Sequence, residues 1–83
     1  MALHEEVRKL AILVKVYATL REYTGGEGTL HIEGADTVQA LMEKIGVPAN
    51  EVKNIMVNGR RRDLDFKLSD GDRVAFFPLI AGG

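Results

Sequence analysis

The apolar positions along the chain predict four β-strands, three of them as apolar runs and one by alternation of polar and apolar residues. Residues 11–18 (AILVKVYA) are dense in β-branched and aromatic side chains, which predicts a buried strand. Residues 29–33 alternate polar and apolar, as a half-exposed strand does. Residues 55–57 and 73–77 are two further short apolar runs that predict strands.

Two turn signals divide the second half of the chain. Asn58-Gly59 is typical of a type I′ hairpin turn, and residues 60–62, three arginines, return from it as a polar strand. Charge on such a strand discourages unwanted pairing, so we expect it at a sheet edge. Residues 69–72 (SDGD) predict a second tight turn, directly before the last strand.

The clearest helix signal lies between these strands. Asp36 can cap a helix, and Gln39 three residues later gives a pattern similar to a capping box. Gly46 ends the helix, and Pro48 prevents its resumption. The helix has one apolar stripe, at i, i+3, i+4 and i+7, formed by Val38, Leu41, Met42 and Ile45.

The predicted order is strand, strand, helix, strand, strand, strand, which is an α+β pattern. One apolar stripe can cover only one face of a mixed sheet. The first and last strands are the most apolar, so we expect them side by side at the centre. This is the β-grasp arrangement of ubiquitin, here as a single domain over 1–83. Residues 1–10 should be a weakly ordered extension, and 79–83 a flexible tail.

Composition limits the chemistry that the domain can perform. A chain of 83 residues buries only about 60–65% of its unfolded surface, which leaves little room for an internal site. Cysteine is absent, which excludes a disulfide framework and a thiol nucleophile. His4 and His31 lack partners at ligand spacing, so we expect no metal site.

Charge and hydropathy also limit the classes of partner that the chain can bind. Lys and Arg number 11 against 12 Asp and Glu, so the basic excess of a generic nucleic-acid binder is missing. Residues 1–10 do not resemble a signal peptide, and no apolar run approaches the roughly 20 residues of a membrane span. We therefore expect a cytoplasmic protein that binds neither nucleic acid nor membrane.

The last five residues are the strongest candidate for chemistry. They extend at most about 17 Å beyond the last strand and end in Gly82 and Gly83. Residues without side chains can thread a narrow channel. A terminal glycine pair is usually only a frayed end, but its place after a strand and an apolar spacer favours a functional tail.

Two other features are candidates for partner contacts. Phe76 and Phe77 are adjacent in a strand, so they point to opposite faces. Phe76 shares the core face with Val74, which leaves Phe77 on the helix-free face, with Met56 nearby, as a partner anchor. The three arginines at 60–62 are more often a solvated edge than a binding site, and a partner contact is the second interpretation.

Six short motifs stand in a fixed order along the chain: LREYTG at 20–25, DTV at 36–38, VNG at 57–59, DGDRV at 70–74, FFP at 76–78 and AGG at 81–83. With these motifs, residues 13–83 resemble the MoaD/ThiS family of ubiquitin-like sulfur carriers, above all the small subunit of molybdopterin synthase. One departure is Leu79, where the family commonly has a second proline.

The resemblance implies a chemistry for the tail. An adenylyltransferase related to ubiquitin-activating enzymes would adenylate the Gly83 carboxylate with ATP. A sulfur donor protein would then leave a thiocarboxylate. The tail would deliver this sulfur, in the large subunit of molybdopterin synthase, to the molybdopterin dithiolene of the molybdenum or tungsten cofactor.

The resemblance also implies roles for residues and partners. The chain would be a non-catalytic carrier without bound cofactor, monomeric when free and heterotetrameric with the large subunit. Gly83 and Gly82 would be the working residues. The residues facing partners would be Phe77, Pro78, Leu79, Ile80, Ala81 and Arg60.

Other functions stay open at this point. The same terminal chemistry would serve a sulfur carrier for thiamine thiazole or for tRNA 2-thiouridine. A protein modifier would instead join its carboxylate to a lysine amine. A free-standing β-grasp binding module would not need its diglycine end, and truncation of the tail separates it from the others.

Overall fold

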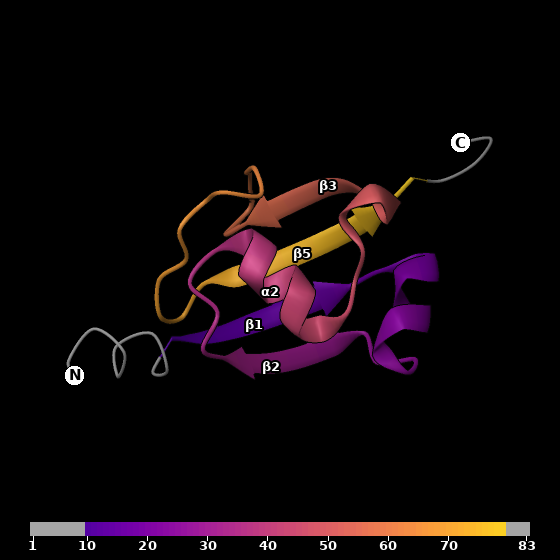
Figure 1. Ribbon diagram of the computed structural model, residues 1–83, viewed down its shortest axis with the longest axis horizontal. Coiled ribbons are helices and arrows are strands. Elements are labelled where there is room, and N and C mark those ends of the chain that lie inside the picture. Colours follow the sequence, from indigo (N-terminus) through magenta and orange to yellow (C-terminus); the bar gives the residue numbers. More distant parts are fainter. Residues whose placement is uncertain (1–9, 80–83) are drawn as a thin grey trace.

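The structure, a computed structural model, describes residues 10–79 and contains the predicted elements in the predicted order (Figure 1). The predicted extension at residues 1–10, apart from Leu10, and residues 80–83 of the tail lie outside the described residues. The elements are β1 (Ala11–Val16), the 3-10 helix η1 (Ala18–Thr24), β2 (Thr29–Glu33), α2 (Val38–Ile45), the 3-10 helix η2 (Ala49–Glu51), β3 (Val52–Val57), β4 (Arg60–Arg61) and β5 (Arg73–Pro78).

The strands form one mixed sheet in the order β2-β1-β5-β3-β4. β1 and β5 are parallel neighbours at its centre, with Val14 opposite Val74 and Val16 opposite Phe76. β2 pairs antiparallel with β1, and β3 pairs antiparallel with β5 and β4. The prediction that the two most apolar strands lie side by side at the centre is therefore confirmed. Each of them has a neighbouring strand on both sides, which helps to bury its apolar side chains.

α2 covers one face of this sheet and leaves the other without a helix (Figure 1). Its stripe is confirmed, since Val38, Leu41 and Met42 are buried, while Ile45 is half-buried at the end of the helix. The sheet meets this stripe with alternate residues of β1 and β5. The core comprises Ile12, Val14, Val16, Leu20, Ala35, Val38, Leu41, Met42, Val47, Val57, Leu68, Val74 and Phe76. This is the β-grasp fold.

The start of α2 differs by one residue from the prediction. Thr37, not Asp36, is the N-cap, and its hydroxyl oxygen accepts a hydrogen bond from the Ala40 amide at 3.1 Å. Gln39 donates to Glu43 at 3.4 Å instead of completing a capping box. Both Asp36 and Thr37 are good capping residues, but Thr37 is the residue directly before the first helical turn, and its backbone is extended as in an N-cap. The predicted end is confirmed, because Gly46 has the left-handed φ of 81° that a C-cap requires.

The two predicted turns are tied together at one end of the sheet. Asn58 and Gly59 both have positive φ, 52° and 82°, as a type I′ hairpin turn requires. The Asn58 side-chain amide donates to Asp72 at 2.9 Å, and its carbonyl oxygen accepts from the Arg73 amide at 2.9 Å. The other carboxylate oxygen of Asp72 accepts from the Ser69 amide at 2.8 Å. These bonds fix where β5 begins.

The helices within residues 10–79 are all too short or too polar to cross a lipid bilayer.

Candidate functional site: the helix-free face and the root of the tail

β5 carries the chain from the centre of the sheet to the root of the tail. It is paired on both sides, with β1 up to Phe76 and with β3 up to Pro78, which lies opposite Val52. Pro78 is buried, whereas the side chain of Leu79 is 72% exposed. The chain therefore leaves the packed domain between these two residues.

The predicted tail residues can be placed only in part. Leu79 is exposed at the root, as a partner contact requires. Pro78 is buried within the described chain, so its predicted contact with a partner stays a prediction. Ile80, Ala81, Gly82 and Gly83 lie outside the described residues. Their roles stay predictions.

Phe77 lies on the helix-free face, two residues before the exposed Leu79. Its ring stacks on the ring of Tyr17, with centroids 4.6 Å apart and planes 4° from parallel. Phe77 is half-buried and Tyr17 is 37% exposed. Phe77 is therefore less exposed than predicted, because the Tyr17 ring covers one side of the Phe77 ring. Together the two rings form an aromatic pair at the root of the tail.

Tyr17 was missed as a site residue in the sequence. It follows β1 by one residue, just as Phe77 follows Phe76 in β5, and Val16 lies opposite Phe76. The backbone continues this pairing, since the Tyr17 amide donates to the Phe76 carbonyl oxygen at 3.3 Å. The prediction that the first and last strands lie side by side was the signal that could have found Tyr17, once their parallel register is known.

Strand register defines the rest of the helix-free face. Residues that are directly opposite on neighbouring strands share a face, and alternate residues along one strand do so too. Met56 lies opposite Ala75 on this face, so its predicted place on the same side as Phe77 is confirmed, although Asn54 is the residue directly beside Phe77. The face consists of Ala11, Leu13, Lys15, Tyr17, Thr29, His31, Glu33, Asn54, Met56, Arg61, Arg73, Ala75 and Phe77.

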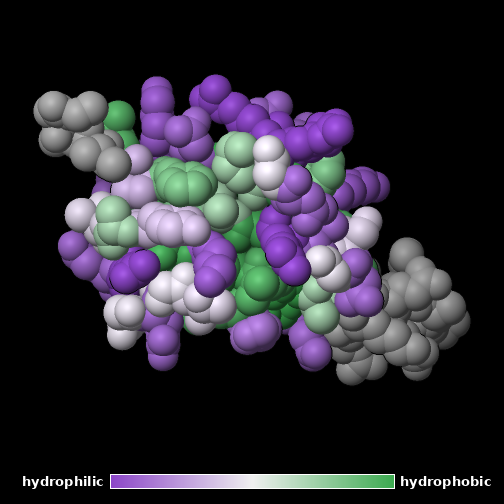
Figure 2. Space-filling model, turned by 180° about the vertical axis from the view of Figure 1, so that it is seen from behind, coloured by the Kyte–Doolittle hydropathy of each residue, from purple (hydrophilic) through white to green (hydrophobic). Residues whose placement is uncertain are grey.

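This face has an apolar middle. Leu13, Met56, Ala75 and Phe77 are each half-buried although no element of the described chain covers them. Figure 2 shows the face from the side opposite α2, with a green apolar area in its middle and purple polar side chains around it. A contiguous apolar area of this kind on a sheet is typical of a protein-binding surface.

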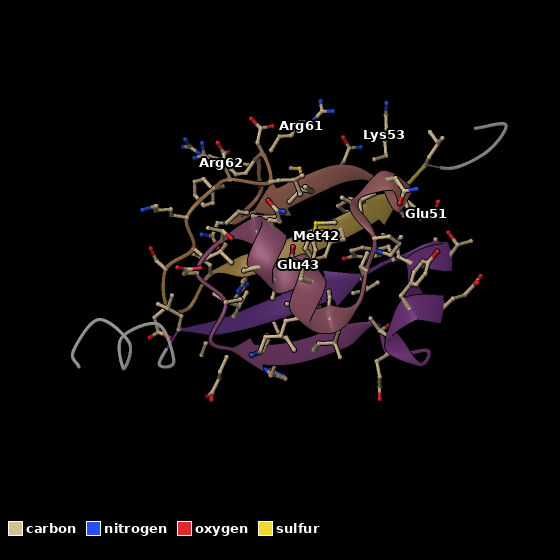
Figure 3. The ribbon with its side chains drawn as sticks, viewed as in Figure 1. Met42, Glu43, Glu51, Lys53, Arg61 and Arg62 are labelled. Carbon is tan, nitrogen blue, oxygen red and sulfur yellow. The ribbon has the colours of Figure 1, made fainter. Side chains whose placement is uncertain are left out.

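The arginines at 60–62 do not act as one group. Arg61 lies opposite Met56 and so borders the helix-free face, whereas Arg60 lies opposite the buried Val57. The Arg62 guanidinium is 4.7 Å from the centre of the Phe66 ring, a cation–π contact. Figure 3 shows Lys53, Arg61 and Arg62 pointing outward along the β3–β4 edge of the sheet. The predicted edge position is confirmed, and the partner contact of Arg60 stays a prediction.

Within residues 10–79, no cluster of three or more His, Asp or Glu residues could hold a metal ion. The Tyr23 hydroxyl donates to Glu51 at 3.4 Å, and desolvation and the nearby Glu51 carboxylate raise the pKa of this phenol. Tyr23 lies on the helix-covered side, beside the end of α2, away from the tail root.

Comparison with known proteins places this fold and this terminus in one family. The ThiS family matches residues 14–83, which includes the last residue of the sequence. The molybdopterin synthase sulfur carrier subunit of Escherichia coli is 30% identical over 80 residues, covering 87% of this chain and 99% of that protein.

Solved structures agree with this assignment. A Pyrococcus furiosus protein described as molybdopterin converting factor subunit 1 is 29% identical, with a TM-score of 0.68 over 86% of this chain and 99% of that chain. A chain of the BexX/CysO complex of Amycolatopsis orientalis is 26% identical, with a TM-score of 0.70 over 88% of this chain and all of that chain. The chain belongs to the ThiS family.

Proposed function

We propose that this protein is a sulfur carrier whose Gly83 carboxylate is converted to a thiocarboxylate and donates sulfur for molybdopterin dithiolene formation. The observation that carries the proposal is the family match, which extends through Gly83, together with the rigid root from which the tail leaves. The Gly83 carboxylate is the proposed working group, and its activation needs no side chain of the carrier.

The chemistry proceeds in two steps. A carboxylate oxygen of Gly83 attacks the α-phosphorus of ATP in the activating enzyme, and pyrophosphate leaves. Sulfur at the sulfide level, supplied by a donor protein, then attacks the carbonyl carbon, and AMP leaves. One C–O bond is replaced by one C–S bond, and no net oxidation occurs. Two such transfers complete a dithiolene.

The energetics of tail binding require a second contact with each partner. Ordering five flexible residues costs roughly 1–2 kcal/mol for each backbone unit, so the tail alone would bind poorly. A protein interface of about 1,200–2,000 Å² supplies the missing free energy. The helix-free face ends at Phe77, next to the root, so a partner that docks there also receives the tail.

The molybdopterin pathway is favoured by the Escherichia coli relative, because the alignment covers nearly all of that sulfur carrier subunit. In this pathway the sulfur acceptor is a pterin intermediate bound in the large subunit of molybdopterin synthase, and that subunit supplies the catalytic side chains. The carrier is then a small subunit that arrives loaded and leaves with a carboxylate.

The test is transfer of labelled sulfur from the thiocarboxylated carrier. The carrier is incubated with the large subunit and its sulfur-free pterin intermediate, and with tRNA and its thiolation enzymes in a parallel reaction. We expect label in the pterin dithiolene and regeneration of the Gly83 carboxylate. Label only in tRNA, or an isopeptide bond to a lysine, would contradict the molybdopterin assignment.

A further inference from the structure

A hollow of about 440 Å³ lies on the helix-free face, at the end of the sheet where the chain enters β1. Leu13 lines this hollow, is half-buried, and lies opposite His31 on β2 and Arg73 on β5. Both of these neighbours are exposed, as is Glu33 at the entry end. The hollow therefore combines an apolar residue with an imidazole and a guanidinium on its two sides.

The chain arrives at the rim of this hollow at a fixed point. Ala11, the first residue of β1, lines the hollow and is held by the turn at residues 69–72. The Ala11 amide donates a hydrogen bond to the Asp70 carboxylate at 2.8 Å, and the Ala11 carbonyl oxygen accepts one from the Gly71 amide at 2.9 Å. Residues 1–9, the N-terminal segment, lie outside the described residues and are tethered beside the hollow through this point.

The sequence of the N-terminal segment is amphipathic. Leu3, Val7 and Leu10 have the i, i+4, i+7 spacing of one apolar stripe on a helix. Glu6 borders this stripe, because it follows Leu3 by three residues and precedes Leu10 by four. At about 100° per residue, Glu5 falls on the opposite side of the same helix. A helix of this length is marginal in water by itself, so it requires a surface to pack against.

We propose that the N-terminal segment folds back as a short helix that covers the hollow. Leu3 and Val7 then pack on Leu13, and the Glu6 carboxylate faces the Arg73 guanidinium. The segment presents apolar side chains where the hollow is apolar, and a negative charge where the hollow is cationic.

The length of the segment matches that of the hollow. Nine helical residues span about 14 Å, at 1.5 Å per residue. Along β1, the path from Ala11 to Lys15 spans about 13 Å. A helix laid back along β1 therefore passes over Leu13 and ends near Lys15, short of the aromatic pair.

A segment of the same chain is favoured over a separate partner because of its tether. A short tether holds the segment at about millimolar effective concentration, so a weak contact suffices to keep the hollow covered. The match to the ThiS family begins at residue 14, so the segment is an addition to the domain that the family shares.

Closure of the segment regulates access to the helix-free face. A cover that is closed for about nine-tenths of the time weakens the apparent affinity of a protein that docks on this face by about tenfold. This consequence rests on the proposed function, in which a partner docks on the helix-free face and receives the tail. The position of the cover does not depend on that function.

The experiment is paramagnetic relaxation enhancement in the full chain, with a nitroxide attached at Ala2→Cys. The chain has no other cysteine, so the label is confined to this site. We expect strong broadening of the amide signals of Leu13, Lys15 and Ala75, and none on α2, which lies on the other side of the sheet. Broadening that is equal on the two sides of the sheet, or confined to the neighbours of Ala11, would overturn the inference.

Two charge reversals at neighbouring positions provide a matched control. Glu6→Lys places a cation beside Arg73 and should remove most of the broadening at Lys15, whereas Glu5→Lys, on the solvent side, should leave it unchanged. Equal broadening in the two variants would overturn the predicted contact. Broadening in a nitroxide-free chain mixed with the labelled chain would assign the segment to a second copy and overturn the intramolecular cover.

ATP–pyrophosphate exchange by the activating enzyme of the same organism tests the regulatory consequence. Relative to Glu5→Lys, Glu6→Lys should lower the KM for the carrier several-fold with kcat unchanged, because it opens the face. If no carrier variant supports exchange, the proposed function fails, and the broadening still decides the cover. If exchange occurs with equal KM for the two variants, the regulatory role of the cover is overturned.

Discussion

Two adjacent phenylalanines offer a sharp test of how the faces of the sheet are used. Phe76 is fully buried under α2, whereas Phe77 is half-buried on the helix-free face. Phe76→Ala should cost about 3–5 kcal/mol of unfolding free energy, the usual cost of removing a core aromatic side chain. A domain of this size has only about 4–12 kcal/mol in total, so Phe76→Ala should be severely destabilised.

Phe77→Ala should have the opposite profile. Its loss removes the stack on Tyr17, which is worth about 0.5–1.5 kcal/mol, and some apolar burial, so the fold should lose about 1–2 kcal/mol. Binding to the activating enzyme should weaken by about 2 kcal/mol, because a rigid aromatic at the tail root is a typical hot spot. That corresponds to roughly 30-fold in Kd.

The assays are urea unfolding followed by far-UV circular dichroism, and titration calorimetry with the activating enzyme. The variants share one chemical change at neighbouring positions, so each is the control for the other. Equal destabilisation by the two substitutions would show that the faces are misassigned. Unchanged binding of Phe77→Ala would remove the aromatic pair from the interface.

Three further changes test other parts of the account. Leu41→Ala should cost about 2–5 kcal/mol in urea unfolding because Leu41 is fully buried in the stripe of α2, and unchanged stability would contradict the packing of that helix. Thr37→Ala should cost about 0.5–2 kcal/mol, and Asp36→Ala clearly less in the same assay; the reverse order would restore Asp36 as the cap. Gly82→Ala should slow adenylation without lowering the melting temperature, because a Cβ widens the tail and restricts its backbone; adenylation at the normal rate would show that the tail threads no narrow channel.

The fold was predictable because its main signals are local. The stripe of α2, the Asn58-Gly59 turn and the two apolar strands each depend on residues a few positions apart, and all three agree with one arrangement. The predicted N-cap, Asp36, was wrong by one residue because Asp36 and Thr37 can both cap a helix. The backbone conformation before the helix decides which of the two is the N-cap, and the sequence pattern does not predict that conformation.

The composition of the helix-free face was less predictable because it depends on pairing between distant strands. Tyr17 reaches Phe77 only through the parallel register of β1 and β5. Arg60 and Arg61 are alike in sequence, and the register against Met56 and Val57 alone decides which of them borders the face. The sequence identified the aromatic residue Phe77 beside the tail, but not the Tyr17 ring that stacks on it and leaves it half-buried.

The central claim is that the Gly83 carboxylate carries the sulfur, and the intact mass of the protein tests it most directly. The chain is incubated with its activating enzyme, ATP and sulfide, beside a control chain that lacks Gly83. We predict a mass increase equal to one oxygen-to-sulfur exchange, located at Gly83 by fragmentation and absent from the control. No cysteine is present to take up sulfur elsewhere in the chain. An unchanged mass at Gly83, under conditions in which the enzyme modifies a known carrier, would contradict the account.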